Sequence, residues 1–273
     1  MGVRRKATTE PVTLGFMAAS DDAIVVEGLT KTFRRQTAVD RVSFRVRRGR
    51  FFGFLGPNGA GKSTTIRMLT GLLRPTAGDA VIEGVRLGED PLGVKRRIGV
   101  VPEELPLYER LTGEEHLLFA ARMHGIDRAE ARRRTAEALE FFSLADERGK
   151  LVVDYSQGMR KKLALACALV HGPSVLFLDE PLNGIDPVSG RVVSDLLRRL
   201  TARGVTLFFT SHVLDVVERL CDEVAVIDRG RIVAQGSLQE IRERRAQGGD
   251  SLEDVFLKLV GADVRREDLS WIG

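Results

Sequence analysis

The chain has 273 residues, of which 43% are hydrophobic and 29% are charged, and its formal net charge is +4. This length and composition predict one core domain with an inserted subdomain and a small tail. No apolar run approaches the ~20 residues that span a bilayer; the longest is residues 163–170. Basic residues stand among 38 acidic ones without interleaved aromatic residues, so nucleic acid is not an expected partner.

Residues 1–21 lack the hydrophobic core of a secretion signal, and we expect them to form a flexible extension. Segments 24–27 and 42–46 alternate apolar and polar residues, which predicts an antiparallel β-layer with Phe33 on the turn between them. Five apolar runs predict the strands of a parallel core: residues 51–55, 98–101, 175–178, 205–210 and 224–227.

A glycine-rich loop follows the first core strand and opens a helix. It consists of Gly56, Pro57, Asn58, Gly59, Ala60, Gly61, Lys62, Ser63 and Thr64. Its glycines let consecutive backbone N–H groups turn toward an anion, and the helix N-terminus adds partial positive charge. Lys62 supplies a charge for the β- and γ-phosphates, and the Ser63 hydroxyl can ligate Mg²⁺. A turn that binds nothing is the alternative, but the flanking strand and helix favour a nucleoside triphosphate site.

Helices are predicted between the second and third core strands. Thr112 begins a capping box, and Asp127 caps a second helix that ends near Ser143. Ser156 caps a third helix, which is rich in Ala and Leu, so its hydroxyl and the next amides form a second anion site. We therefore expect residues 104–172 to form a helical subdomain inserted into the core.

Two adjacent carboxylates, Asp179 and Glu180, end the third core strand. A buried parallel strand would deliver Asp179 to the Mg²⁺ beside Ser63. Strand alternation would turn Glu180 the other way, where it can polarise an attacking water. A strand that simply ends in two solvated acids would be favoured only without the upstream loop, so we interpret the pair as metal ligand and general base.

The last third of the chain predicts further helices. Asp186 and Pro187 mark a helix start, Gly204 marks its end, and Ser237 begins another short helix. Residues 247–250 form a linker to a final helix with an apolar stripe, made of Leu252, Val255, Phe256 and Leu259. We expect a core domain over residues 22–236 and a helical tail over residues 237–273.

The order of these motifs resembles that of the ABC (ATP-binding cassette) ATPases over residues 24–236. Residues 155–159 occupy the place of the family signature, and residues 183–186 match the loop after the catalytic Glu. The resemblance implies an α/β fold with a phosphate-loop core, an antiparallel β-layer and a helical subdomain, with ATP and Mg²⁺ as cofactors. It also assigns further residues to the site: Phe33 to adenine, Ser156, Gln157 and Gly158 to phosphate, and His212 to the γ-phosphate and water.

Glu103 departs from the family pattern, because most members carry there a glutamine that reaches Mg²⁺ and the water. A carboxylate is also a metal ligand, and a stronger one than an amide, so we expect Glu103 to contact the metal while it adds negative charge near the triphosphate. This variation, and the tail around Phe256, are similar to the ATPases of antibiotic, drug and sodium exporters.

The resemblance implies a head-to-tail dimer, with ATP held between the loop of one chain and the signature of the other. The second ATPase subunit is another copy or a paralogue. We expect a cytoplasmic protein, peripheral on the inner face of the membrane, that powers a separate multi-pass subunit. The expected contact surface consists of Glu103, Glu104, Leu105, Leu107, Tyr108 and Leu111. The alternatives are an importer ATPase, or a soluble ABC ATPase that acts on ribosomes or DNA.

Overall fold

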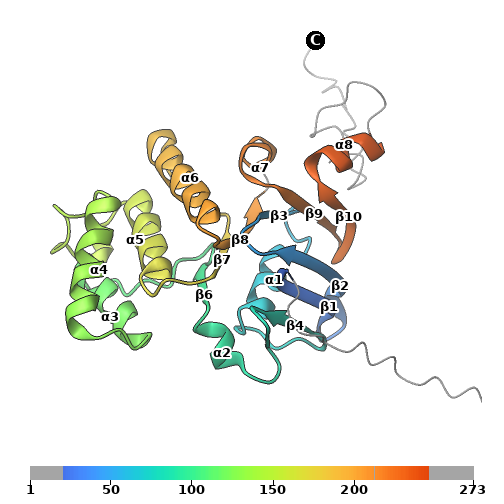
Figure 1. Cartoon of the computed structure of the whole chain (residues 1–273), viewed down its shortest axis with the longest axis horizontal. Coiled ribbons are helices and arrows are strands. Elements are labelled where there is room, and N and C mark those ends of the chain that lie inside the picture. Colours follow the sequence, from blue (N-terminus) through green and yellow to red (C-terminus); the bar gives the residue numbers. More distant parts are fainter. Residues whose placement is uncertain (1–20, 212, 246–273) are drawn as a thin grey trace, which may run out of the picture.

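The computed structural model describes residues 21–211 and 213–245, with residues 242–245 as backbone only. Within these residues the chain builds two sheets and the helices that surround them (Figure 1). The expected last helix, the rest of the N-terminal extension and His212 lie outside the described residues. The predicted domain boundaries therefore stay predictions.

The larger sheet has six strands in the order β10-β9-β3-β8-β7-β6. Its parallel strands are β3 (Phe51–Leu55), β6 (Ile98–Val101), β7 (Val175–Asp179), β8 (Thr206–Ser211) and β9 (Glu223–Asp228). The five predicted core strands are thus confirmed, with ends that differ by one residue. Strand β10 (Arg231–Ser237), antiparallel to β9, was not predicted.

The smaller sheet confirms the predicted antiparallel layer and extends it. Its strands, in the order β2-β1-β4-β5, are β1 (Asp22–Phe33), β2 (Gln36–Arg47), β4 (Ala77–Ile82) and β5 (Val85–Arg86). Strands β1 and β2 are longer than the predicted segments. The prediction was too short because register shifts interrupt their pairing, and such bulges break the apolar-polar alternation on which it relied. Phe33 is the last residue of β1, beside the turn.

Caps set the starts of several helices as expected. The helices are α1 (Lys62–Leu69), α2 (Pro91–Lys95), α3 (Gly113–Met123), α4 (Arg128–Phe141), α5 (Gln157–Leu169), α6 (Pro187–Ala202), α7 (Leu214–Leu220) and α8 (Leu238–Arg245), with a 3₁₀ turn at Val152–Asp154. Thr112 forms the full capping box of α3 with Glu115. The Ser156 hydroxyl accepts from the Met159 amide and so starts α5.

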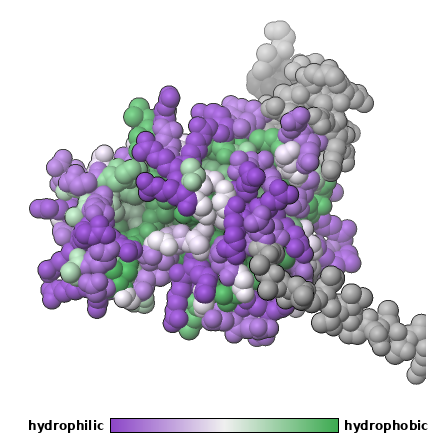
Figure 2. Space-filling model, in the orientation of Figure 1, coloured by the Kyte–Doolittle hydropathy of each residue, from purple (hydrophilic) through white to green (hydrophobic). Residues whose placement is uncertain are grey.

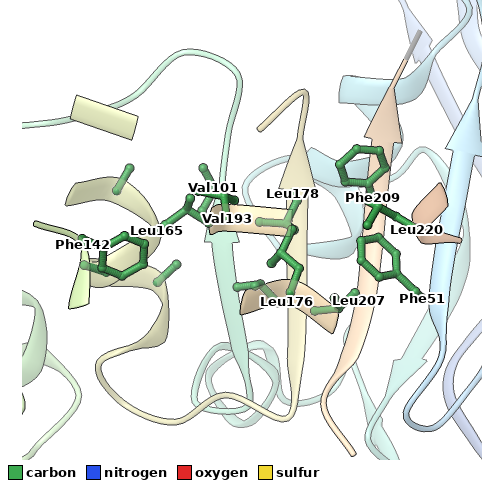
Figure 3. Packing of buried hydrophobic residues seen from close by; sticks show 14 of the residues in the cluster. Phe51, Val101, Phe142, Leu165, Leu176, Leu178, Val193, Leu207, Phe209 and Leu220 are labelled. Atoms are coloured by element: carbon green, nitrogen blue, oxygen red, sulfur yellow. The ribbon is translucent and has the colours of Figure 1, made fainter. Parts of the chain in front are cut away.

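Both faces of the parallel sheet are buried, which explains why its strands are continuous apolar runs. On one face the rings of Phe52, Phe54 and Phe208 pack against Phe44 of the antiparallel sheet. The centroids of neighbouring rings in this group lie 5.3–5.7 Å apart. On the other face Phe51 and its neighbours join a cluster that continues to the helical region (Figure 3). The alternation of β3 side chains between these two clusters joins the two sheets.

Helices α3, α4 and α5 lie together on one side of the parallel sheet, and the antiparallel sheet lies on the other (Figure 1). The phosphate loop joins β3 to α1, the segment after β6 leads into α3, and the segment after β7 leads into α6. Within the described part of the chain, no helix is both long enough and apolar enough to cross a membrane.

Candidate functional site

The loop between β3 and α1 needs glycine at two positions because other backbone comes close. A Cβ on Gly56 would lie 2.3 Å from the Ile227 carbonyl oxygen, and one on Gly61 would lie 2.7 Å from that of Ala38. Gly61 also has φ +112°, which L side chains rarely adopt. Strands β2 and β9 therefore fix the shape of the loop from behind.

Lys62 is buried under this loop, at the start of α1. Its Nζ donates to the carbonyl oxygens of Gly56 at 2.7 Å and Pro57 at 3.3 Å. Burial lowers the pKa of the ammonium, and the nearby Glu180, Asp179 and Glu103 carboxylates counteract that shift. The side chain thus lies among three acids, beside the amides of the loop.

A pocket of about 390 Å³ opens beside the loop and combines residues from distant parts of the chain. Its lining consists of Ala38, Asn58, Gly59, Gly61, Lys62, Ser63, Thr64, Glu103, Glu180 and Asn183. Asp179 is buried at the end of β7, where its Oδ1 accepts from the Thr210 hydroxyl at 2.6 Å. The loop and the acids expected for metal and water are therefore neighbours.

The orientation of Glu180 does not come from strand alternation, which corrects the sequence-based argument. Strand β7 ends at Asp179, and Glu180 has φ +49°, in the left-handed region. Its amide donates to the Thr210 hydroxyl at 3.1 Å, and its carbonyl oxygen accepts from Lys161 Nζ at 2.9 Å. Contacts from β8 and α5 hold this backbone, and they are tertiary rather than local.

The residues present fit a triphosphate and Mg²⁺. No described side chain caps α1 and no acid occupies its first turn, so its first amides remain available to phosphate. Ser63, Glu103 and Asp179 offer oxygen atoms, which Mg²⁺ prefers as ligands. Among the described residues, no group of three or more His, Cys, Asp or Glu side chains forms a metal site.

Several predicted site residues do not line this pocket. Ser156 and Gly158 are outside its lining. Gln157 lines an adjacent cavity of about 230 Å³, together with Glu103. Phe33 is 47% exposed, with Lys31 Nζ 5.1 Å from its ring centroid. Phe33 and Ser156 are therefore accessible to a ligand or partner without sharing the loop's pocket.

Sequence reasoning assigned no role at the site to Ala38, Asn183, Thr210 and Lys161. The side chain of Ala38 gives no indication in the sequence that this residue belongs to the site, because only its backbone and its position contribute to the pocket. Thr210 was placed on the fourth core strand, but its bonds to Asp179 and Glu180 depend on strand pairing. Lys161 stands in the basic run after the signature, and its burial beside the Glu180 carbonyl follows from how α5 packs.

A phosphate loop, paired acids at the end of a buried parallel strand, an antiparallel layer and a helical insertion define the class of ABC ATPases. The ABC transporter family model matches residues 39–183, more than half of the chain, and the chain belongs to that family. It is therefore an ATP-binding and ATP-hydrolysing subunit of the ABC transporter type.

Curated relatives and solved structures agree with this membership. The chain is 39% identical over 254 residues to the doxorubicin resistance ATP-binding protein DrrA of Mycobacterium tuberculosis, covering 92% of this chain and 75% of that protein. It is 38% identical over 226 residues to the linearmycin resistance ATP-binding protein LnrL of Bacillus subtilis, covering 83% and 72%. A solved ATP-binding subunit of an ABC transporter superposes with a TM-score of 0.81 at 34% identity, covering 87% of this chain and 99% of that one. The dimeric ATP-binding cassette MJ0796, bound to ADP and Pi, shares the fold at 24% identity with a TM-score of 0.74, covering 79% and 98%.

Proposed function

We propose that this chain powers an exporter from the inner face of the membrane, as one half of a head-to-tail ATPase dimer. The observation that carries this proposal is the composition of the pocket. It contains the loop and the acids, whereas the signature residue Ser156 is outside its lining. A phosphate site at the start of α5 is then completed by the pocket of a second chain.

Each predicted site residue has a proposed role. Lys62 and the loop amides would bind the β- and γ-phosphates, and Ser63 and Glu103 of the pocket, with Asp179 at the end of β7, would hold Mg²⁺, which would neutralise phosphate charge. Glu180 accepts a proton from the attacking water. His212 is assigned to the γ-phosphate on its place in the sequence alone, since it lies outside the described residues. Phe33 stacks on adenine at the exposed end of β1.

The site at the start of α5 supports the shared geometry. The Ser156 hydroxyl caps the helix, and Gly158 leaves open space where a Cβ would stand. Amides at a helix N-terminus bind phosphate oxygens. Hydrogen bonds from both chains to one γ-phosphate make the closed dimer depend on ATP, and hydrolysis removes them. Opening and closing can then drive a partner.

A groove of about 870 Å³ provides a place for the membrane subunit. Its lining comes from α2, β6, α3 and α5, which are neighbours in Figure 1. Leu72, Leu92 and Met123 line it and are 65%, 64% and 70% exposed. Figure 2 shows a largely hydrophilic face whose hydrophobic residues gather over its left half, toward the helical region. An apolar groove of this kind suits the amphipathic helix of a partner.

Part of the contact surface expected from the sequence joins this groove. Leu107 lines it, while Leu105 and Leu107 both pack against the core cluster. Tyr108 and Glu104 are exposed beside it. Glu103 belongs to the same chain segment as Leu107 and lines the phosphate pocket. A partner in the groove therefore lies close to the residue expected to contact the metal.

Export is favoured over import by the relatives. DrrA and LnrL are described as resistance proteins for doxorubicin and linearmycin, and a 42% identical protein of Ralstonia nicotianae, over 222 residues, is described as a Nod factor export ATP-binding protein. Amphipathic organic molecules are therefore the cargo class that we propose.

Accumulation of doxorubicin and a panel of amphipathic drugs in the source cells tests this function. Cells that carry Lys62→Ala in place of the native chain should accumulate more of at least one drug, because ATP binding is lost. The matched control is Lys150→Ala, which removes a surface lysine that pairs with Glu147 in the described part of the chain. An importer would give less accumulation in the Lys62→Ala cells, and equal accumulation for every drug would contradict export of this class.

A further inference from the structure

Lys161 joins the helix that begins at the signature to the catalytic edge of the core. It stands on α5, is only 4% exposed, and donates from Nζ to the Glu180 carbonyl oxygen at 2.9 Å. A buried ammonium is costly unless its charge and its hydrogen bonds are satisfied. This lysine therefore has a local reason to remain beside Glu180.

The backbone that Lys161 contacts is an unfavourable one. Glu180 has φ +49°, and a left-handed conformation at a residue other than glycine persists only where its surroundings hold it. The Thr210 hydroxyl accepts from the Glu180 amide, so β8 holds one side of this residue. Lys161 holds the other side from α5, and the Asn183 amide donates to the same carbonyl oxygen at 3.3 Å.

The charges around Lys161 give a second, independent reason for its position beside Glu180. Burial lowers the pKa of Lys161, and the carboxylates of Glu180 and then Glu103 counteract that shift. Glu103 lines both the phosphate pocket and the adjacent cavity that Lys161 lines. The other charged residues of that cavity are Arg160 and Glu109, whose side chains pair with one another at 3.5 Å. Lys161 is thus a second buried cation, besides Lys62, that feels the charges of Glu180 and Glu103.

We propose that Lys161 is a positioning residue of the ATPase site: it holds the main chain of Glu180 and offsets the negative charge of Glu103. The proposal rests on the proposed role of Glu180 as the base. It also gives the carboxylate at position 103 a local counter-charge. Together with Lys62, Lys161 reduces the repulsion among Glu103, Glu180 and a bound triphosphate.

Lys161→Met tests the proposal, because methionine fills the same space without the charge or the donor. We expect kcat for ATP hydrolysis to fall at least about tenfold, as for a misplaced catalytic group. The Kd for ATP should change less than about threefold, since the loop contacts remain. Lys162→Met is the matched control on the same helix and should keep kcat within about twofold of wild type. A Lys161→Met kcat equal to that of Lys162→Met overturns the proposal.

Two more variants separate charge from position and guard against misfolding. Lys161→Arg keeps the charge and a donor, so it should retain more kcat than Lys161→Met at a similar melting temperature. Adding Glu103→Gln to Lys161→Met removes the carboxylate that lost its partner, and kcat should recover at least about threefold. No recovery overturns the charge compensation.

Glu180→Gln, measured in parallel, keeps the failure of this inference distinct from that of the base assignment. An active Glu180→Gln enzyme removes Glu180 as the base, and the Lys161 proposal falls with it. An inactive Glu180→Gln enzyme, together with an unaffected Lys161→Met enzyme, overturns only the role of Lys161.

Discussion

The proton acceptor is the first residue to test. Glu180→Gln fills the same space but cannot take a proton, so ATP binding should persist while turnover falls at least about a hundredfold. ATP should then trap a dimer, because the bonds that close it are not removed. Calorimetry measures the binding and light scattering measures the dimer. A variant with wild-type turnover would exclude Glu180 as the base.

Glu103 is tested by two substitutions with different chemistry. The amide oxygen of Glu103→Gln can still meet Mg²⁺, whereas Glu103→Ala has no ligand atom. We expect Ala to lower ATPase activity more than Gln does, and to weaken the response to the membrane subunit. Glu140→Ala, at an exposed acid of α4 outside the expected contact surface, is the control. Equal activities for Glu103→Ala and the control would make Glu103 only a surface acid.

His171 makes stability depend on pH. Burial lowers its pKa to about 4, assisted by the charge of His124, whose ring stacks on it at 3.7 Å. The unfolded chain takes up this proton near its ordinary pKa of 6.5, and the folded chain does so only near 4. Stability is therefore lost as pH falls from 6.5 toward 4. Thermal melts should show a smaller loss over this range for His171→Gln, and an identical loss would contradict the assignment.

At the scale of the element, the capping box of α3 can be tested by itself. Thr112 accepts from the Glu115 amide, and the Glu115 carboxylate accepts from the Thr112 amide. Thr112→Ala removes the first of these bonds and should cost about 1 kcal/mol of unfolding free energy. Thr112→Ser keeps the hydroxyl and should cost less. Urea unfolding of both variants gives the comparison, and equal stability would show that the cap contributes nothing here.

A helix or strand could be predicted where a local pattern of the sequence specifies it, and was missed where pairing with a distant segment does. Core strands such as β7 were predicted because a strand buried on both faces is a continuous apolar run. Helices α3 to α6 were predicted from their capping residues, which are local. Strands β5 and β10 were missed because they are short or half-buried, so their composition differs little from that of a loop. Their pairing depends on neighbours distant in sequence.

The candidate site divides in the same way. The phosphate loop and the pair Asp179 and Glu180 could be predicted, because motif and strand are contiguous. The left-handed backbone of Glu180 and its contacts to Thr210 and Lys161 could not, since they join three segments that only folding brings together. Sequence reasoning therefore gave most residues of the pocket, without Ala38 and Asn183, and missed the contacts that position Glu180.

At the scale of the whole molecule, the shared site can be tested by complementation. Lys62→Ala disables the loop half of a site, and Ser156→Arg disables the signature half by placing a bulky cation there. In a mixed head-to-tail dimer, one site receives both defects and the other receives none. Mixing the two inactive proteins should therefore restore ATP-dependent pairing, measured by light scattering. Pairing by wild type but never by the mixture would contradict the shared site.

The position of β3 in the sheet has a consequence for protein synthesis. Strand β3 carries the phosphate loop, yet it pairs only with β8 and β9, and β8 begins about 150 residues further along the chain. At about 5–20 residues per second, a nascent chain would expose this apolar strand for about 8–30 s before its partners emerge from the ribosome. We therefore expect the apolar side chains of β3 to be a target for chaperones, and ATP to stabilise the loop only after β8 and β9 have joined the sheet.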